Sequence, residues 1–399
     1  MPLTRICGKH PGGLGRPMAD VSPVHPVCRS SVAIDAGSPS LPTNKPLSNA
    51  MLIAETAKSA DPSSWSAESE QPLQPGGLGH AVPSSVDPAD CRDAAVPRRQ
   101  SDAGFWSDVL VLSKPRIVTM ILVTTVATAM IGAALRPEGT GGLSVVAMLW
   151  LLIGTGGVAA SAGAANQIWE RVIDRRMVRT SGRPLPAGRM SAAAAIGWAL
   201  FWGLGGTVLL WAMFGAAPAI VGIATWALYV LVYTPMKTRT AWNTTVGAVA
   251  GALPVLMGFT AAGGRLADPT PWLLFGVLAA WQYPHFMSIA WLYRRQYKEA
   301  GFCMTTGSDP TGRSAAIQSL IGTLAIAGCG LVLCLQGGLV WWNIAGALAV
   351  LAACWPLWKA SCRFAACPAD DISRTMLRSS LLTLPAVLLV TTVCILASA

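Results

Sequence analysis

Between residue 117 and the C-terminus, the sequence consists mainly of long charge-free apolar stretches separated by short basic segments. An α-helix needs about 20 apolar residues to cross roughly 30 Å of hydrocarbon, and it satisfies its backbone hydrogen bonds internally, as the bilayer interior requires. Hydrophobic residues make up 53% of the 399 residues and charged residues only 12%, a balance that is unusual for a soluble globular protein. The chain is therefore expected to be an all-α, polytopic membrane protein.

The lengths of the apolar stretches predict nine transmembrane helices. Two stretches are long enough for two crossings each, with natural breaks at Gly215-Ala216-Ala217-Pro218 and at Gln336-Gly337-Gly338. The predicted stretches are 117–135, 139–169, 190–236, 240–264, 269–293, 314–358 and 379–399.

Basic residues fall almost entirely on one side of this nine-helix topology. With the N-terminus inside, the inner segments carry 18 Lys and Arg residues, whereas the outer segments carry only Arg136 and Arg265. Because positively charged loops stay on the cytoplasmic side, the count predicts a cytoplasmic N-terminus. It also supports the nine-helix count independently.

The first 104 residues differ sharply in composition from the rest. They hold 14 of the 28 prolines, abundant Ser, Gly and Ala, and nine basic against ten acidic residues. Such a segment cannot bury enough surface to offset its ordering entropy, which predicts a disordered tail over 1–104 and a transmembrane domain over 105–399. The acidic residues argue against a mitochondrial transit peptide, so a bacterial inner membrane is favoured over the mitochondrial inner membrane. A mis-assigned start codon is an equally simple explanation of the tail.

Two functional classes are excluded by the placement of charges and cysteines. The 20 basic residues of 105–399 lie between apolar stretches, whereas a nucleic-acid-binding protein gathers its charge on a soluble face. The ten cysteines include no C-x-x-C pair, are not accompanied by clustered histidines, and several lie inside apolar stretches. Neither nucleic-acid recognition nor a disulfide or zinc scaffold is indicated.

A polar stripe marks the point where the second predicted helix leaves the membrane. Asn166, Glu170 and Asp174 recur at i, i+4 and i+8, so they share one helical face over about 12 Å. Hard oxygen ligands in this arrangement suit Mg²⁺ that bridges a phosphate group. The alternative is a solvated helix end whose acids pair with Arg171 and Arg179.

Basic residues follow the stripe in a loop shaped by Pro and Gly. Arg179 and Arg183 lie directly after it, and Lys237 and Arg239 lie in a second loop on the same predicted side. A metal together with guanidinium groups is typical of a diphosphate site. For the second loop, an ordinary positively charged cytoplasmic loop is the alternative.

His285 is the only histidine after residue 80, and it lies within an apolar stretch directly after Pro284. An ionisable residue inside the membrane is a candidate functional residue by default. The alternative is a neutral histidine that donates to a carbonyl of a neighbouring helix freed by the proline.

Together these motifs resemble the UbiA-type intramembrane prenyltransferases, and among them the haem-modifying branch, the protoheme IX farnesyltransferases. The resemblance covers essentially all of 105–399, and its most discriminating segment is Trp281-Gln282-Tyr283-Pro284-His285-Phe286. The other matching residues are Ser113-Lys114-Pro115-Arg116, Asn166, Glu170, Asp174, Arg179-Thr180, Arg183-Pro184-Leu185, Tyr233-Thr234, Lys237, Arg239-Thr240, Asn243, Gly247, Gly251-Ala252, Pro254, Tyr297, Ala300-Gly301 and Met304.

This resemblance implies a UbiA-like helical bundle that transfers farnesyl from farnesyl diphosphate to a vinyl group of protoheme IX. Water addition completes haem O, on the route to haem A, and diphosphate leaves. The implied partners are the two substrates, the lipid bilayer and, as protein partners, haem A synthase or terminal-oxidase assembly factors. The implied site residues are Asn166, Glu170 and Asp174 for catalysis and Mg²⁺; Lys114, Arg116, Arg179, Arg183, Lys237 and Arg239 for diphosphate; and His285 for haem contact or iron ligation.

Two positions depart from the family pattern. Gln296 stands where the family usually has an acid, and Arg294 and Arg295 precede it, so a second Mg²⁺ site is in doubt. Glu299 and Asp309 are the candidates to replace the missing ligand. Val255 replaces a second proline, which is expected to alter helix shape more than chemistry.

Two alternative functions remain at this stage. A UbiA-type prenyltransferase could act on an aromatic quinone precursor instead of haem. A transporter of an anionic solute is the more distant alternative, because transporters tend to place charged residues near the membrane midplane on broken helices. The carboxylates here lie at helix ends.

Overall fold

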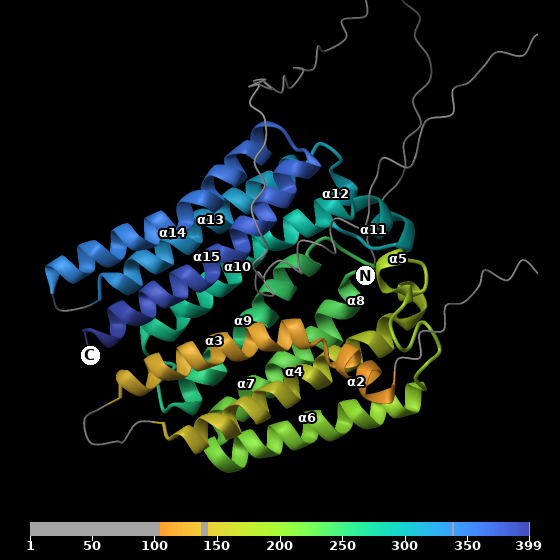
Figure 1. Cartoon of the computed structure of the whole chain (residues 1–399), viewed down its shortest axis with the longest axis horizontal. Coiled ribbons are helices and arrows are strands. Elements are labelled where there is room, and N and C mark those ends of the chain that lie inside the picture. Colours follow the sequence, from red (N-terminus) through yellow and green to blue (C-terminus); the bar gives the residue numbers. More distant parts are fainter. Residues whose placement is uncertain (1–103, 137–142, 337–338, 399) are drawn as a thin grey trace, which may run out of the picture. The chain divides into compact units, whose positions relative to one another are not determined.

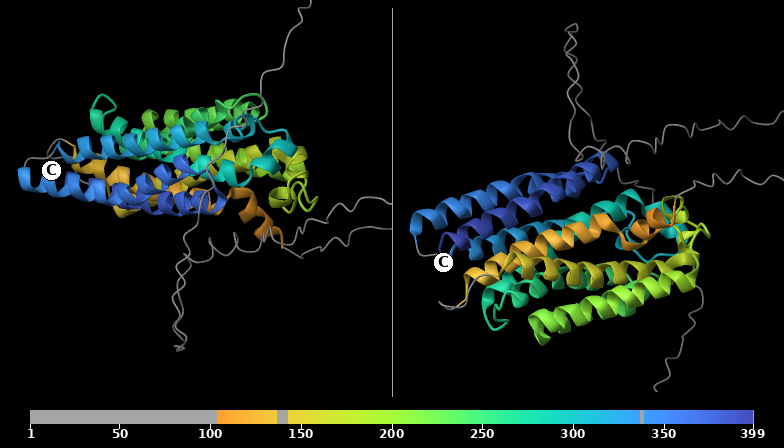
Figure 2. Two further views of the ribbon diagram at one scale, coloured as in Figure 1. Left: turned by 90° about the horizontal axis from the view of Figure 1, so that it is seen from above. Right: turned by 60° about the horizontal axis from the view of Figure 1, so that its bottom comes forward.

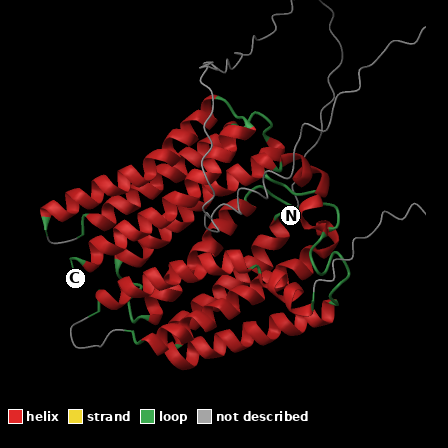
Figure 3. Ribbon diagram, viewed as in Figure 1, coloured by secondary structure: helices red, strands yellow, loops and turns green. Residues whose placement is uncertain are grey.

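The computed structural model describes residues 104–136, 143–336 and 339–398. This part of the chain is helical with connecting turns and contains no strand (Figure 3). The predicted all-α fold is therefore confirmed. The predicted tail over 1–104 lies outside the described residues except for Gly104.

Within the described ranges, nine long helical segments succeed one another along the chain. They are α3 (Pro115–Ala134), α4 (Val145–Asp174), α6 (Ala192–Phe214), the continuous segment α7 (Ala216–Ala227), η3 (Leu228–Tyr233) and α8 (Thr234–Met236), then α9 (Asn243–Ala261), α10 (Pro269–Leu292), α13 (Arg313–Cys334), α14 (Val340–Ala366) and α15 (Asp370–Leu396). The shorter helices are α2 (Phe105–Ser113), α5 (Val178–Ser181), α11 (Arg294–Ala300) and α12 (Thr305–Ser308).

Eight of these long segments are both long and apolar enough to cross a membrane. The exception, α10, has 24 residues, but its apolar sequence is interrupted by the polar run from Gln282 to His285. It packs against α9, α13 and α15, so it belongs to the same bundle. The chain is a multi-span membrane protein whose helices match the predicted stretches closely.

The predicted breaks within the long apolar stretches also appear. Gly215 ends α6 with a φ of 82°, a backbone conformation that a residue with a Cβ rarely adopts, and α7 begins at the next residue. Around the second predicted break, α13 ends at Cys334 and α14 begins at Val340, while 337–338 lie outside the described residues.

The long helices lie alongside one another as a bundle, as all the views show (Figures 1 and 2). The backbones of α4 and α6 approach very closely: a Cβ on Gly206 would lie 2.7 Å from the carbonyl oxygen of Gly154. Close approach through small residues is a common way for membrane helices to associate. It fixes α4, the helix that carries the polar stripe, firmly against its neighbour.

One end of the bundle gathers the short helices and most of the charged residues. There α2, α5, α8, α11 and α12 lie near the C-terminal end of α4 (Figure 1). We call this the basic end. Polar segments that are far apart in sequence are thus brought together at the place where α4 presents its stripe.

Candidate active site

The polar stripe of α4 is buried at the basic end. Because α4 continues without a break to Asp174, Asn166, Glu170 and Asp174 keep the helical spacing that aligns them on one face. Their exposed fractions are only 1%, 5% and 0%. A solvated helix end would leave these groups in water, so their burial disfavours that alternative.

Each member of the stripe is matched by a cation from a different part of the chain. The Lys114 ammonium donates to Asn166 Oδ1. Lys237 Nζ lies 2.7 Å from Glu170 Oε1, and Arg183 Nη1 lies 2.6 Å from Asp174 Oδ2.

These pairings differ from the solvated-end alternative, in which Arg171 and Arg179 pair with the acids. Arg171 instead donates to the carbonyl of Ile168, and Arg179 donates to the hydroxyl of Tyr297. A buried ion pair must offset a large desolvation cost, so its presence is weak evidence for a role in stability. The arrangement leaves three cations and three oxygen donors in one small, dry volume.

The two lysines of the site differ in their electrostatic surroundings. Burial lowers the pKa of Lys114, although neighbouring Tyr229 and Glu170 oppose this. Burial would also lower the pKa of Lys237, but the Glu170 carboxylate raises it above its ordinary value. Of the two lysines, Lys114 contacts a neutral amide and Lys237 a carboxylate, so an additional anion such as a phosphate oxygen would stabilise Lys114 more.

A π-helical turn, η3, shapes the wall of the site opposite the stripe. Thr234, just after it, donates to the carbonyl of Tyr229 at 2.9 Å and accepts from Asn166 Nδ2 at 3.1 Å. Lys237 Nζ lies 4.6 Å from the centre of the Tyr233 ring. Irregular turns of this kind are frequent at functional sites.

Glycine on α9 makes room for that wall. A Cβ on Gly247 would lie 2.7 Å from the Tyr233 ring, so the ring can sit there only because residue 247 has no side chain. Tyr233 and Gly247 both belong to the family pattern, and in this chain their packing against each other explains why these two residue types occur together.

Arg179 links the loop after α4 to the segment after α10. Its guanidinium lies 5.1 Å from the ring centre of Tyr293 and 5.7 Å from that of Tyr297, and Nη2 donates to the Tyr297 hydroxyl at 3.1 Å. Arg179 itself is exposed. It is thus a cation held on aromatic rings, with a face still open to solvent.

The loop that carries Lys237 is tied to the segment after α11. Asn243 Nδ2 donates to the carbonyls of Thr240 and Cys303, and the Cys303 amide donates to the carbonyl of Lys237 at 2.7 Å. Asn243, another residue of the family pattern, therefore joins the loop that carries Lys237 to the segment after α11. Arg116 and Arg239 are exposed, and the ion pairs of the described residues do not include them.

The candidates for a replacement acid lie in different surroundings from the stripe. Gln296 is half-buried and Glu299 is exposed. Asp309 accepts from the amides of Thr311 and Ser314 and from the Thr311 hydroxyl, and these hydrogen bonds lower its pKa to about 2. Both of its oxygens are therefore engaged at the start of α13.

His285 joins α10 to α15. Its Nδ1 lies 3.0 Å from Ser380 Oγ, and its ring stacks on Trp281 with 4.7 Å between centroids. The hydroxyl of Ser380 also lies 2.7 Å from the carbonyl oxygen of Leu377, to which it can donate. The hydrogen-bond partner of His285 is thus a hydroxyl rather than the carbonyl of the alternative interpretation.

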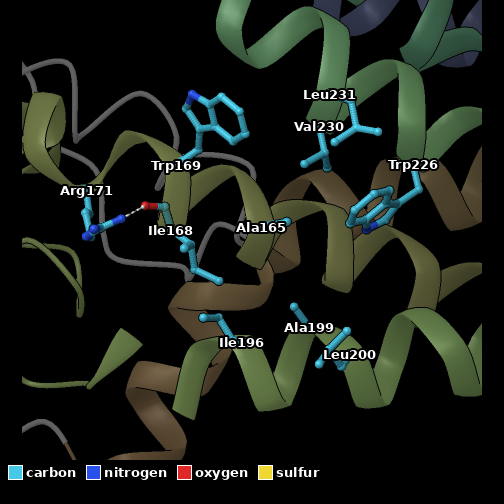
Figure 4. Close-up of a pocket in the computed structure, with 10 residues that line it drawn as sticks. All are labelled: Ala165, Ile168, Trp169, Arg171, Ile196, Ala199, Leu200, Trp226, Val230 and Leu231. Carbon is cyan, nitrogen blue, oxygen red and sulfur yellow. Dashed lines mark hydrogen bonds between the residues drawn. The ribbon is translucent and has the colours of Figure 1, made fainter. Parts of the chain in front are cut away.

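A shallow groove of about 420 Å³ lies elsewhere on α4 (Figure 4). It is bounded by α4, α6 and the segment from α7 to η3, and Arg171 is the only charged residue that lines it. None of the stripe residues lines the groove. We therefore assign the site to the buried cluster and not to this groove.

The stripe suits a divalent cation by the chemistry of its donors. It offers two carboxylates and one amide oxygen, and Asp174 Oδ1 is buried without a hydrogen-bond partner among the described residues. No group of three or more His, Cys, Asp or Glu side chains in the described ranges could hold a metal. A metal here would therefore take its remaining oxygens from a substrate, as Mg²⁺ commonly does.

Comparisons with known proteins agree with this geometry. Residues 125–382 match the UbiA prenyltransferase family. The protoheme IX farnesyltransferase of Rhodopirellula baltica is 59% identical over 285 residues, which cover 70% of this chain and 97% of the relative. The chain belongs to the UbiA prenyltransferase family, and the resemblance inferred from its motifs is confirmed.

Solved structures share the fold at low sequence identity. A structure described for digeranylgeranylglyceryl phosphate synthase has a TM-score of 0.59 at 14% identity and covers 73% of this chain and 99% of its own. A UbiA homologue from Archaeoglobus fulgidus bound to DMAPP and Mg²⁺ has a TM-score of 0.52 at 15% identity, with 72% and 100% covered. Membership of an enzyme family sets the transporter alternative aside.

The sequence pattern missed four residues of the cluster: Asp108, Gln167, Arg189 and Tyr229. Asp108 is buried and forms a bidentate pair with Arg189, whereas Gln167 and Tyr229 contact the Lys114 region directly. The sequence feature that could have identified these four residues is the occurrence of a polar residue within or beside an apolar stretch.

Proposed function

We propose that this protein transfers farnesyl from farnesyl diphosphate to a vinyl group of protoheme IX, with water addition, to give haem O and diphosphate. The observation that carries the proposal is the buried stripe of Asn166, Glu170 and Asp174 with its three cations. Its similarity to a protoheme IX farnesyltransferase over most of both chains supports the choice of substrates.

The chemistry requires charge stabilisation at the leaving group. The C1–O bond of farnesyl diphosphate breaks, and its electron pair leaves with the diphosphate. The vinyl π electrons of haem then form the new carbon–carbon bond at C1. The oxygen of water adds to the resulting cation and loses a proton.

The cationic side chains of the site suit this first step. Lys114, Lys237 and Arg183 already lie at the stripe, and Arg179 lies at its rim on the tyrosine rings. Preorganised cations in a water-poor site stabilise charge that develops in the transition state. We propose that Arg116 and Arg239, which are exposed, assist diphosphate capture from the surface.

Mg²⁺ would be held by Asn166, Glu170 and Asp174 and would supply additional positive charge to the diphosphate oxygens. The unpartnered Asp174 Oδ1 and the hard oxygen donors support this assignment. The same side chains keep their lysine and arginine partners close to the leaving group.

His285 is proposed to contact the haem, with iron ligation through Nε2. Its Nδ1 is engaged by the Ser380 hydroxyl, so Nε2 is the ring nitrogen available to the iron. Neutral imidazole is a common axial ligand of haem iron.

The basic end is proposed to face the cytoplasm of a bacterial cell, in the inner membrane, with the N-terminus inside. The supporting observation is the 18-to-2 distribution of basic residues. Residues 1–104 are proposed to be dispensable for catalysis, and haem A synthase or terminal-oxidase assembly factors are the proposed protein partners. A chain starting near Ser101 should insert and remain active if the tail contributes nothing to the site.

Product analysis tests the proposal directly. Membranes that contain the protein should convert haem and farnesyl diphosphate to haem O, detected by mass spectrometry of extracted haem. Prenylation of a hydroxybenzoate acceptor without haem O formation would instead establish the quinone-precursor alternative.

A further inference from the structure

Lys114 has the most unusual backbone conformation among the described residues that carry a side chain. With φ 53° and ψ 59°, it is their only non-glycine residue with a positive φ. The left-handed region is sterically unfavourable for an L-residue with a Cβ, and a helix that ends this way usually uses glycine. Lys114 ends α2 and precedes α3, so the chain keeps a lysine where glycine would be less strained.

The side chain of Lys114 explains why a lysine is kept there. Its ammonium donates to Asn166 Oδ1 and lies 3.5 Å from the Tyr229 hydroxyl. Its stem passes over Gly163, where a Cβ would be 3.6 Å from the stem carbons. The strained backbone therefore delivers a half-buried cation to the candidate active site.

Gln167 holds the backbone that leads into Lys114. It is fully buried, and its Nε2 donates to the carbonyls of Val111 at 3.0 Å and Leu112 at 2.9 Å. The last carbonyls of a helix have no partner within the helix, so they need donors from outside. Two adjacent residues of α4 thus contact the Lys114 region. Asn166 binds the side chain of Lys114, and Gln167 binds the backbone that precedes it.

The other end of α2 is fixed separately. Asp108 is buried and forms a bidentate pair with Arg189, with the shortest distance 2.7 Å. At the C-terminal end of α2, next to Lys114, the indole of Trp198 donates to Ser113 Oγ at 3.1 Å. α2 is therefore attached to the stripe helix, to the loop after it and to α6.

We propose that Gln167 is a positioning residue of the reaction: by binding the last carbonyls of α2, it holds Lys114 in the conformation that presents its ammonium to the substrate diphosphate. The inference rests on the proposed function, in that it takes the substrate to be a prenyl diphosphate. The role is assigned to the Nε2 donor of Gln167; its Oε1 is buried without a hydrogen-bond partner among the described residues.

The test is a double-mutant cycle between Gln167→Met and Lys114→Met. Methionine has a similar volume to glutamine but no N–H donors. The affinity for a non-reactive thiolodiphosphate analogue of farnesyl diphosphate is measured by calorimetry on the full-length detergent-solubilised protein, together with kcat and KM. Gln167→Met should weaken analogue binding by about tenfold, in line with the loss of buried hydrogen bonds.

If Gln167 acts through Lys114, the double variant should bind no more weakly than Lys114→Met alone. Thr155→Val is the matched control, because it removes a buried hydroxyl from the same helix, where Thr155 donates to Met257 Sδ. It should leave analogue binding unchanged. Asp108→Asn, which loosens α2 from its other end, should weaken binding in the same direction and show the same coupling to Lys114, should Gln167→Met fail to fold.

The inference is overturned if the losses of Gln167→Met and Lys114→Met simply add, if Thr155→Val weakens binding equally, or if Lys114→Met binds the analogue normally. Absence of haem O from the wild-type protein would instead overturn the proposed function, and the binding cycle would still report on the coupling between Gln167 and Lys114.

Discussion

The loop after α4 and the segment after α10 both lie at the basic end, but they use their charges differently. At the end of α4, Glu170 and Asp174 are buried; Glu170 pairs with Lys237 from a distant loop, and Asp174 pairs with Arg183 of the loop that follows α4. After α10, Glu299 is exposed and Asp309 is engaged at the start of α13. Arg294 pairs with Asp370 at a half-exposed surface position.

This difference supports the proposed role of Glu170 and Asp174 in the reaction. Buried ion pairs cost desolvation and give little net stability, so burying two of them side by side suggests a role beyond folding. Acids that accept from backbone N–H groups near a helix start or pair at the surface have a sufficient structural explanation. The second segment contributes instead the tyrosine rings that hold Arg179, so one half of the bundle supplies anionic and cationic groups and the other supplies an aromatic support.

The largest effect is expected from neutralising the stripe. Glu170→Gln and Asp174→Asn should each lower turnover by at least about 100-fold, because they remove a principal electrostatic element from the transition state. The rate of haem O formation by the purified protein measures this loss of turnover. Asp309→Asn makes the same chemical change in the segment after α10 and should leave turnover within about twofold. Equal losses in the stripe variants and in Asp309→Asn would show that the acids of the two regions do not differ in their effect on turnover.

A smaller effect is expected where the two segments meet. Arg179→Lys keeps the charge but loses the planar stacking on Tyr293 and Tyr297, and we expect about tenfold lower turnover. Tyr297→Phe keeps the ring and loses only the hydroxyl, so its loss should be a few-fold. Normal turnover in Arg179→Lys would show that only the charge matters at this position.

Asp309→Asn should chiefly affect stability. We expect a loss of about 1 kcal/mol at pH 7, the usual magnitude for a carboxylate that satisfies backbone N–H groups near a helix start. Because hydrogen bonds hold the folded pKa at about 2, below the ordinary 3.8, this stabilisation is present above pH 3.8 and is lost as the pH falls through 2. Thermal unfolding of both proteins from pH 7 to pH 2 measures it; a constant difference over this range would contradict the assignment.

The smallest effect is expected for Glu299→Gln. If Arg294, Arg295 and Lys298 neutralise diphosphate in place of the acid missing at Gln296, the Mg²⁺ dependence of the rate should stay almost unchanged. If Glu299 is instead a metal ligand, the Mg²⁺ concentration for half-maximal rate should rise severalfold, which Mg²⁺ titration of the rate would detect. We favour the first outcome because Glu299 is exposed and two arginines precede Gln296.

The prediction of the fold succeeded because its signals are local. Apolar length fixed the helices, Gly215 marked a break between two of them, and the four-residue spacing placed Asn166, Glu170 and Asp174 on one face. The sequence also grouped the cations near the stripe, since they follow helix ends on one predicted side of the membrane.

The identity of each cation partner could not be predicted from spacing. Arg171, Arg175, Arg176 and Arg179 are all closer in sequence to the acids, yet Lys237 and Arg183 are the residues that reach them. Gln167 likewise looked like one polar residue among apolar ones, and only its contact with α2 shows what it holds.

The sequence by itself therefore determined which residues are helical, which face of α4 is polar, and which family of membrane enzymes the chain resembles. Only the tertiary structure decided which of the many basic residues meet that face, that Lys114 does so from a strained left-handed backbone, and that His285 bonds to Ser380. The physical reason is that periodicity and apolar length act along one helix, whereas an ion pair or a hydrogen bond between helices depends on how close their side chains come once the bundle has packed.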